Sequence, residues 1–208
     1  MEDGLTSLKN PKVKYARGLR ERKERDRLGV TLLEGYRELS RALAAGMKFR
    51  EVFFCPELFL GENEPALLAA LAASGSTNFR CSADVLRSLA YRDRPEGLIA
   101  VIEIRRKTLA EIPRKADGLY LVAETIEKPG NLGSMLRSAD AVGATAVIVC
   151  DKQTDMFNPN VIRASTGAIF NVPLAEATNE EALAWLKGAG ILTLAATPHT
   201  DRNFTDAD

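Results

Sequence analysis

Apolar residues in the first half of the chain alternate between helical spacing and short continuous runs. Across residues 32–46 they recur at three- and four-residue intervals, which predicts a helix that ends at Gly46. By the same reasoning, helices are expected over residues 10–27, 64–73 and 83–90, and strands over residues 51–58, 79–82 and 97–104. Alternating helices and strands of this length predict a small α/β sandwich.

A polar segment at residues 107–118 separates this pattern from a second one. The segment contains Pro113 and ends in a glycine, so we expect a linker there, and it is a candidate hinge. Beyond it, continuous apolar runs at residues 119–124, 145–150, 169–174 and 191–197 predict four strands, and residues 131–142, 158–166 and 179–188 predict helices between them. Strands that are apolar on both faces and alternate with helices predict a mostly parallel sheet covered on both sides.

These patterns predict two domains, residues 1–106 and residues 119–208, joined by the linker at residues 107–118. The second domain should be incomplete at its C-terminus, because the chain stops soon after the fourth apolar run and leaves that strand without a covering helix. We therefore expect the natural protein to continue beyond Asp208, or another chain to supply the missing cover.

Composition argues against several classes of protein. The chain has 208 residues and no net charge, and 46% of its residues are hydrophobic, as in ordinary globular proteins. No apolar run approaches the roughly 20 residues of a membrane-spanning helix, and the N-terminus lacks the apolar core of a secretory signal, so a cytoplasmic location is expected. The single histidine, His199, argues against a zinc site and a Ser-His-Asp hydrolase. The three widely spaced cysteines, Cys55, Cys81 and Cys150, are expected to be buried, reduced thiols.

Charge is unevenly distributed in spite of the zero total. Nine basic and three acidic residues lie between Lys9 and Arg27, an excess of +6 within nineteen residues. Such a basic arm on a neutral protein favours a docking surface for a polyanion. The same pattern also fits a solvated helix stabilised by Glu–Arg pairs, and the sequence leaves both interpretations open.

One stretch, EKPGNLGSMLRSADAVGA at residues 127–144, carries the candidate chemistry. Proline and glycine break the chain after the first strand of the second domain, and Asn131 is expected to cap the helix that follows. Gly133 would let another backbone or a ligand approach the first turn. Arg137 lies about 140° around the helix from Leu132 and outside the apolar stripe, so it could reach the cleft at the strand ends where open α/β sheets bind ligands.

Each of these residues also has a purely structural interpretation. Asn131 could be only a cap, Gly133 only a packing residue, and Arg137 only a surface arginine paired with Asp140. The sequence contains neither a GxGxxG fingerprint nor a GxxxxGK[ST] loop. Nucleotide binding in the usual dinucleotide or P-loop manner is therefore not expected.

Three parts of the chain together resemble the SpoU/TrmH branch of the SPOUT RNA methyltransferases. NLGSMLRSADAVGA (residues 131–144) is similar to the family's first motif, an Asn-x-Gly-x-x-x-Arg helix start. NPNVIRASTGAIFNVPL (residues 158–174) is similar to the second motif, a Ser-x-Gly-Ala turn that leads into a strand ending in proline. LLEGYRELSRALAAG, EVFFCPEL and RPEGLIAVI resemble the family's substrate-binding domain, which has a ribosomal-protein-like fold. The resemblance covers nearly the whole chain and implies a SPOUT-type α/β-knot sheet in the second domain.

The resemblance implies a dimeric, metal-independent enzyme that uses S-adenosylmethionine to methylate ribose 2′-hydroxyls of ribosomal or transfer RNA. In such an enzyme Arg137 would contact the ribose or phosphate and help to remove the hydroxyl proton, Asn131 would position that arginine or the RNA, and Glu124 is a candidate partner for Arg137. A guanidinium is a poor base, so Arg137 must lose a proton transiently or act by orienting the hydroxyl and a phosphate. The expected RNA contacts are Lys9, Lys12, Lys14, Arg17, Arg20, Arg37, Arg41 and Ser165.

The chain departs from the family after the fourth predicted strand. The third family motif, Gly-x-Glu-x-x-Gly followed by Ser-Leu-Asn, is absent from the sequence. In the family those segments build most of the S-adenosylmethionine pocket and thread a C-terminal knot. Only one wall of the pocket is expected here, at Ala195, Ala196 and Thr197, so this chain is expected to bind the cofactor weakly or not at all.

Two other classes of function stay open from the sequence. The basic arm and the first domain could form a non-catalytic RNA-binding module, which a stop codon directly after Asp208 would favour. An in-frame third motif would favour the enzyme instead. A Rossmann-like enzyme for small molecules is disfavoured, because the glycine-rich phosphate loop is absent.

Overall fold

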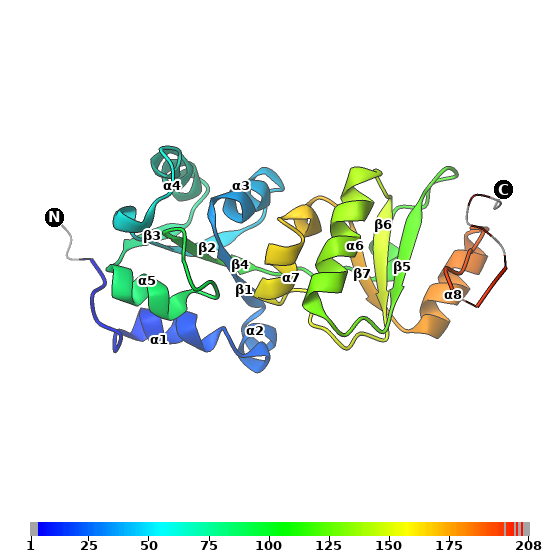
Figure 1. The fold of residues 1–208 in the computed structure, drawn as a ribbon, viewed down its shortest axis with the longest axis horizontal. Coiled ribbons are helices and arrows are strands. Elements are labelled where there is room, and N and C mark those ends of the chain that lie inside the picture. The colour runs from blue at the N-terminus through cyan, green and yellow to red at the C-terminus, as the bar shows by residue number, and fades with distance from the viewer. Residues whose placement is uncertain (1–3, 198, 202, 204, 206–208) are drawn as a thin grey trace.

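The structure, a computed structural model, describes residues 4–197, 199–201, 203 and 205. Two α/β units lie side by side along the long axis of the molecule, with the N-terminal unit at the left of Figure 1. The first unit contains a four-stranded sheet and the second a three-stranded sheet. This arrangement agrees with the predicted mixed α/β class. None of the helices in the described part of the chain is long and apolar enough to cross a membrane.

The sheet of the first unit is mixed and has the strand order β1-β4-β2-β3. Its strands are β1 (Val30–Glu34), β2 (Phe49–Phe54), β3 (Thr77–Arg80) and β4 (Leu98–Glu103). Strand β4 pairs antiparallel with both β1 and β2, whereas β2 and β3 run parallel. All five residues of β1 are buried, although β1 is an edge strand of this sheet. The edge must therefore be covered by other parts of the molecule.

Helices cover both faces of the first sheet. They are α1 (Pro11–Gly18), α2 (Arg22–Leu28), α3 (Tyr36–Ala44), α4 (Glu64–Ala73) and α5 (Ala83–Leu89), with a short 3-10 turn η1 (Pro56–Leu58). Val52 packs with apolar residues of α3 and α4, whereas its neighbour Phe53 packs with those of α1 and α5. Consecutive strand residues point to opposite faces, so the two sets of helices lie on opposite sides of the sheet.

The sheet of the second unit is parallel and has the order β5-β6-β7. Its strands are β5 (Tyr120–Glu124), β6 (Ala146–Cys150) and β7 (Leu174–Ala177), and its helices are α6 (Pro129–Ala141), α7 (Pro159–Ala164), η3 (Ala168–Phe170) and α8 (Asn179–Gly188). Val147 packs with apolar residues of α6 and α7, and its neighbour Ile148 packs with Trp185 of α8. The second sheet is thus covered on both faces, as the continuous apolar strands predicted.

The predicted helix over residues 32–46 is wrong at its beginning. Leu32 and Leu33 belong to β1, and the helix starts only at Tyr36. Gly35 separates the two elements with a φ of 102°, a backbone conformation that favours glycine. The helical spacing of Leu32 and Leu33 was therefore coincidental.

Two predicted strands of the second unit also differ from the structure. Residues 168–170 form η3, and the third strand begins only at Leu174. Residues 191–197 have no regular secondary structure, and residues 192–197 are exposed, so the fourth predicted strand is not formed by the described residues. Strand β5 consequently remains an edge strand, and both Val122 within it and Leu119 directly before it are exposed.

The predicted linker packs against the second unit. Its turn η2 (Leu109–Glu111) contacts β7, and Ile112 is buried in the core beneath α8. Lys107 forms a parallel bridge with Ala175 through the backbone. A hydrogen bond from the Tyr120 hydroxyl to the Pro113 carbonyl closes the end of the segment at 2.8 Å. These contacts oppose free hinge motion within residues 107–118.

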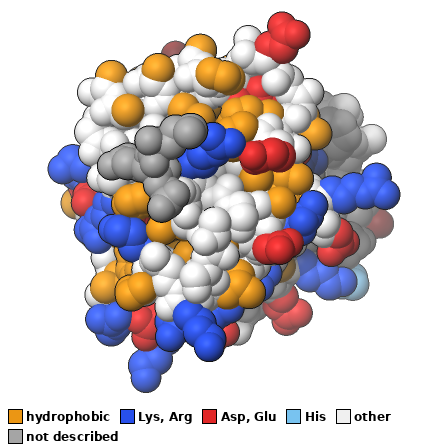
Figure 2. Space-filling view, turned by 90° about the vertical axis from the view of Figure 1, so that its left-hand side faces the viewer, with side chains coloured by type: hydrophobic (Ala, Val, Ile, Leu, Met, Phe, Trp, Pro, Cys, Tyr) orange, Lys and Arg blue, Asp and Glu red, His pale blue; other side chains and the backbone are white. Residues whose placement is uncertain are grey.

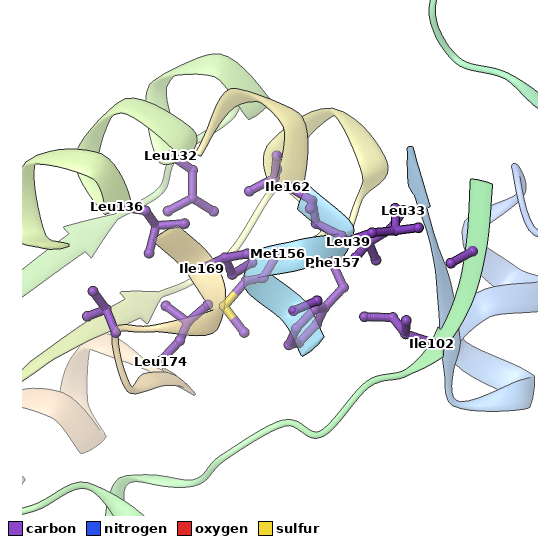
Figure 3. Packing of buried hydrophobic residues seen from close by; sticks show 14 of the residues in the cluster. Leu33, Leu39, Ile102, Leu132, Leu136, Met156, Phe157, Ile162, Ile169 and Leu174 are labelled. Carbon is purple, nitrogen blue, oxygen red and sulfur yellow. The ribbon is translucent and has the colours of Figure 1, made fainter. Parts of the chain in front are cut away.

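The two units share one hydrophobic core. Figure 3 shows Leu33, Leu39 and Ile102 of the first unit directed toward Phe157 and Ile162 of the second. Helix α7 lies along β1 and covers its free edge, and the Thr31 hydroxyl donates a buried hydrogen bond to the Phe157 carbonyl at 2.7 Å. The units are therefore joined by buried apolar surface, and not only by the chain that connects them.

Buried and half-buried charges reinforce the same junction. The Arg25 guanidinium, on a residue only 2% exposed, contacts the Asp155 carboxylate at 2.7 Å. Arg106 lies between the units and pairs with Asp26 at 2.6 Å and with Glu176 at 2.6 Å. Arg25 and Asp26 belong to α2, whereas Asp155 precedes α7 and Glu176 lies in β7, so these pairs link the N-terminal arm to the second unit.

Candidate functional site

Helix α6 carries the residues of the Asn-x-Gly-x-x-x-Arg motif. The helix begins at Pro129, whose fixed φ suits a first helical position, and Lys128 is the residue that precedes it. Asn131 is therefore the third residue of the helix, and the prediction that it caps the helix is wrong. Its side chain is exposed, which makes its amide accessible to a ligand at the strand-end edge of the sheet.

Gly133 serves the contact between α6 and α7. A Cβ atom at this position would lie 2.4 Å from the Ala164 Cβ and 2.8 Å from the Ser165 backbone nitrogen. Such distances are far below van der Waals contact, so only glycine allows the two helices to approach this closely. The close approach predicted for Gly133 is thus made by another helix.

Arg137 projects from α6 against the end of α7. It is the ninth residue of α6 and lies in the third turn, about 12 Å along the axis from the helix start. Its guanidinium donates to the Ala164 carbonyl, and it lies 3.4 Å from the Ser134 hydroxyl. The side chain is exposed, and a guanidinium has five N–H donors. Arg137 is therefore anchored at one side and retains donors for a phosphate or a hydroxyl.

Glu124 does not pair with Arg137 in the structure. One of its carboxylate oxygens accepts a hydrogen bond from the Asn179 side-chain amide at 2.6 Å. Asn179 is the first residue of α8, so this bond joins the end of β5 to the start of that helix. The expected partnership of Glu124 with Arg137 is therefore not observed.

The predicted cofactor wall lies outside the sheet. Ala195, Ala196 and Thr197 are exposed, in a segment without regular secondary structure that follows α8. The Thr197 hydroxyl accepts a hydrogen bond from the His199 backbone N–H at 3.2 Å, and His199 is an exposed loop residue. These three residues do not enclose a pocket in this conformation.

The basic arm folds into α1 and α2. Its five candidate RNA contacts are exposed: Lys9, Lys12, Lys14, Arg17 and Arg20. Lys12 lies over the Phe79 ring at 4.4 Å, and Arg20 donates to the Ala90 carbonyl at 2.6 Å, so both also have structural partners. Figure 2 shows the end of the first unit, where Lys and Arg side chains are interspersed with acidic and apolar ones. The arm is thus a mixed surface with several exposed cations.

Two residues that would have to be on the surface to contact RNA are buried. Arg25, one of the nine bases of the arm, is buried and donates to the carbonyls of Leu19 and Arg20 in addition to contacting Asp155. Ser165, a candidate RNA contact, is fully buried, and its hydroxyl donates to the Ile162 carbonyl at 2.8 Å. Neither side chain can touch RNA in this conformation.

Arg37 and Arg41 lie on α3, and Arg41 reaches the second unit. Arg37 is exposed. Arg41 packs against Gly167 and lies 3.9 Å from the Asp140 carboxylate at the end of α6. Asp140 therefore pairs with Arg41 and not with Arg137. Asp140 lies less than one helical turn from Arg137 on α6, so this pair brings Arg41 of the first unit close to Arg137 of the second.

Arg163 is an exposed cation near the junction that sequence reasoning did not single out. It lies on α7, one residue before the carbonyl that Arg137 contacts. Burial raises the pKa of Glu34, whereas the charges of Arg92 and Arg163 act in the opposite direction. Arg163 thus lies close enough to β1 to affect its last carboxylate. Nothing in the spacing of the second motif indicated this placement.

The cysteines and the side chains that commonly bind metals form neither a reactive thiol nor a metal site in the described part of the chain. Cys55, Cys81 and Cys150 are free and buried, as predicted. Burial raises the pKa of Cys55 and Cys150 to about 11 and that of Cys81 to about 12, so these thiols are poor nucleophiles near neutral pH. Within the described ranges, no group of three or more His, Cys, Asp or Glu side chains could hold a metal ion.

Comparison with known families assigns both units. Residues 10–100 match the MRM3-like substrate binding domain, and residues 118–208 match the SpoU rRNA Methylase family. A curated relative, the 23S rRNA (uridine(2479)-2′-O)-methyltransferase of Streptomyces viridochromogenes, is 29% identical over 91% of this chain. The chain spans 68% of that relative.

Solved structures extend the comparison. A crystal structure titled RNA 2′-O ribose methyltransferase is 40% identical and has a TM-score of 0.85, over 98% of this chain and 76% of its own. The AdoMet-bound rRNA methyltransferase from Sinorhizobium meliloti is 30% identical, with a TM-score of 0.80 over 90% of this chain and 69% of its own. Fold and sequence therefore agree across nearly the whole chain.

Proposed function

The chain belongs to the SpoU/TrmH family of RNA 2′-O-ribose methyltransferases, and we propose that it transfers the methyl group of S-adenosylmethionine to a ribose 2′-hydroxyl of ribosomal or transfer RNA. The names of the relatives favour ribosomal RNA. The methylase family model matches residues 118–208, which favours an enzyme over a binding module without chemistry. The observation that carries the proposal is the exposed Arg137 guanidinium, which is held by the Ala164 carbonyl at the end of α7.

Arg137 would bind and orient the acceptor ribose. A guanidinium stays protonated near neutral pH, so its N–H groups would donate to a phosphate or to the 2′-oxygen. Its bond to the Ala164 carbonyl fixes the side chain before the RNA arrives, which reduces the entropy lost on binding. The hydroxyl proton would pass to solvent water, and the positive charge of Arg137 would stabilise the 2′-oxygen as negative charge develops on it.

S-adenosylmethionine supplies a methyl group already activated on a sulfonium, so alignment of the acceptor is the main task of this chain's residues. The described residues do not by themselves enclose that cofactor, because Ala195, Ala196 and Thr197 are exposed. Helices α6 and α7 build the acceptor side of the site. Glu124 would act on α8 through Asn179, and any catalytic role for it requires a rearrangement of that bond.

We assign residues 1–106 to RNA binding, residues 107–118 to the connection and residues 119–208 to methyl transfer. The MRM3-like match over residues 10–100 supports the first assignment. Exposed cations of the arm and of α3, chiefly Lys9, Lys14, Arg17 and Arg37, would contact phosphates. We also propose a cytoplasmic homodimer that needs no metal, which light scattering and activity in the presence of a chelator would test.

The test is tritiated-methyl incorporation into cellular RNA by the protein at its full natural length. Arg137→Ala should lower the rate by about 10²–10³-fold, the usual effect of removing one preorganised donor. Arg137→Lys should recover little, because an ammonium lacks the planar fork of donors. The matched control is Arg87→Ala, since Arg87 is exposed on α5 and, among the residues that the structure describes, its one ion pair is with Asp84 at 3.4 Å. Incorporation that is absent from the wild type, or equal in Arg137→Ala, would reject the proposal.

A further inference from the structure

We propose that the cleft between the two units binds one nucleotide of the substrate RNA, with its base in the apolar interior and its phosphate on Lys107. The inference rests on the proposed RNA methyltransferase function and adds a binding site to it. The cleft has a volume of about 210 Å³. It is lined by Ala45 and Met47 after α3, by Arg105 and Lys107 of the connecting segment, and by Phe157 and residues 169–174 of the second unit.

The size of the cleft limits its ligand. Sites that enclose a drug-sized ligand usually measure about 300–1,000 Å³. A volume of about 210 Å³ is too small to enclose a whole nucleoside cofactor but accommodates a single ring system. Most lining residues are apolar, and two of them, Phe157 and Phe170, are aromatic. Figure 3 shows Phe157, Ile169 and Leu174 gathered at the junction of the units. Apolar and aromatic walls of this kind suit a planar base.

The charged side chains that line the cleft favour a polyanionic ligand. The two ionisable residues of its lining, Arg105 and Lys107, are both basic. Arg105 already pairs with Glu111 at 2.7 Å, whereas no ion pair of Lys107 occurs among the described residues. The backbone bridge to Ala175 fixes the position of Lys107. A cation with a fixed backbone beside an apolar hollow is the combination that binds single-stranded nucleic acid.

The cleft adjoins the helix that carries Arg137. Asn171 belongs to its lining, and the Asn171 amide lies 3.4 Å from the Asp140 carboxylate. Asp140 follows Arg137 by three residues, which corresponds to a rise of about 4.5 Å along α6. A strand whose target ribose lies at Arg137 could therefore place a nearby nucleotide in the cleft.

The experiment measures binding of a fluorescein-labelled 12-residue oligouridylate by fluorescence anisotropy at several salt concentrations. Lys107→Ala should weaken binding and reduce the slope of log K against log salt by about 0.7, the value for one phosphate contact in a single strand. Lys107→Arg should restore the slope. The matched control is Lys187→Ala, which removes an exposed lysine from the last turn of α8.

A second variant tests the base without changing charge. Ala45→Trp would fill the cleft from the exposed end of α3, and it should weaken binding by about five- to 150-fold, the range expected for loss of one stacked base, with an unchanged salt slope. Wild-type affinity in both Lys107→Ala and Ala45→Trp, or no binding by the wild type, would overturn the inference. Methyl incorporation by the wild type is measured separately, so a failed cleft and a failed methyltransferase are distinguishable.

Discussion

Replacing Arg25 with alanine should lower the free energy of unfolding by about 3–5 kcal/mol, the usual effect of removing one partner of a buried ion pair. The Arg25 side chain is 3% exposed and that of Asp155 is 4% exposed. The change would leave the Asp155 carboxylate buried without its closest cation, since Arg106 lies 3.9 Å away. It would also remove the donor to the Leu19 and Arg20 carbonyls. A loss of this size is a large share of the roughly 5–15 kcal/mol that stabilises typical domains.

Urea denaturation followed by circular dichroism and by Trp185 fluorescence measures the effect. Arg25 lies in α2 of the first unit, and Trp185 packs in the core beneath α8 of the second. Because the Arg25 pair joins the units, both signals should shift together. The matched control is Arg27→Ala on the same helix: the Arg27 side chain is 61% exposed and pairs with Glu24 in solvent, so its loss should cost far less stability than the loss of Arg25.

A double variant separates the ion pair from simple packing. Arg25→Met combined with Asp155→Leu should recover much of the lost stability, because apolar residues of similar volume often replace a buried pair without cost. The reasoning is refuted if Arg25→Ala is no more destabilising than Arg27→Ala. It is also refuted if the Trp185 transition stays in place while the circular dichroism transition moves.

Two further predictions follow from the packing of α6 and the burial of Glu34. Gly133→Ala should destabilise the protein by about 1–3 kcal/mol in thermal unfolding, because the added Cβ would lie 2.4 Å from the Ala164 Cβ. Gly130→Ala in the same helix places its Cβ in open space and should be neutral or stabilising, so equal effects of the two substitutions would contradict this account. Burial raises the pKa of Glu34, so its contribution to stability is greatest below the unfolded pKa of about 4.3 and falls as pH rises through the native value. Unfolding of Glu34→Gln measured from pH 4 upward should therefore gain on the wild type with rising pH, and a constant difference would argue against the raised pKa.

Local signals predicted the elements that depend on local chemistry. The helix over residues 64–73 was predicted at its observed bounds, and so was the helix over residues 179–188, which has a capping box at Thr178 and Glu181. Strand β1 was missed because it is buried on both faces and shows no alternation, so Leu32 and Leu33 fitted the helical spacing that follows. The segment at residues 191–197 was predicted as a strand because it is apolar, but none of the residues described by the structure pairs with it as a strand.

The sequence predicted the residues of the candidate site that lie on one helix, but not the contacts that other elements make with them. The motif placed Asn131, Gly133 and Arg137 on α6. It could not show that Ala164, 27 residues after Arg137, receives the guanidinium and meets Gly133. Arg25 illustrates the opposite error, since a basic arm predicts exposed cations, and only the fold brings Asp155 beside it. Such pairings depend on the docking of the two units, which no local pattern encodes.

The ion pairs of Arg106 have a consequence for the choice of substrate. Arg106 pairs with a carboxylate of α2 and with a carboxylate of β7, so it opposes movement of the arm relative to the unit that carries Arg137. The distance between the two RNA contacts, the arm and Arg137, then limits which RNAs can bind. An RNA that engages both ends at once must present its anchoring backbone and its reactive ribose at that spacing, so three-dimensional shape, and not base sequence alone, would decide which riboses are methylated.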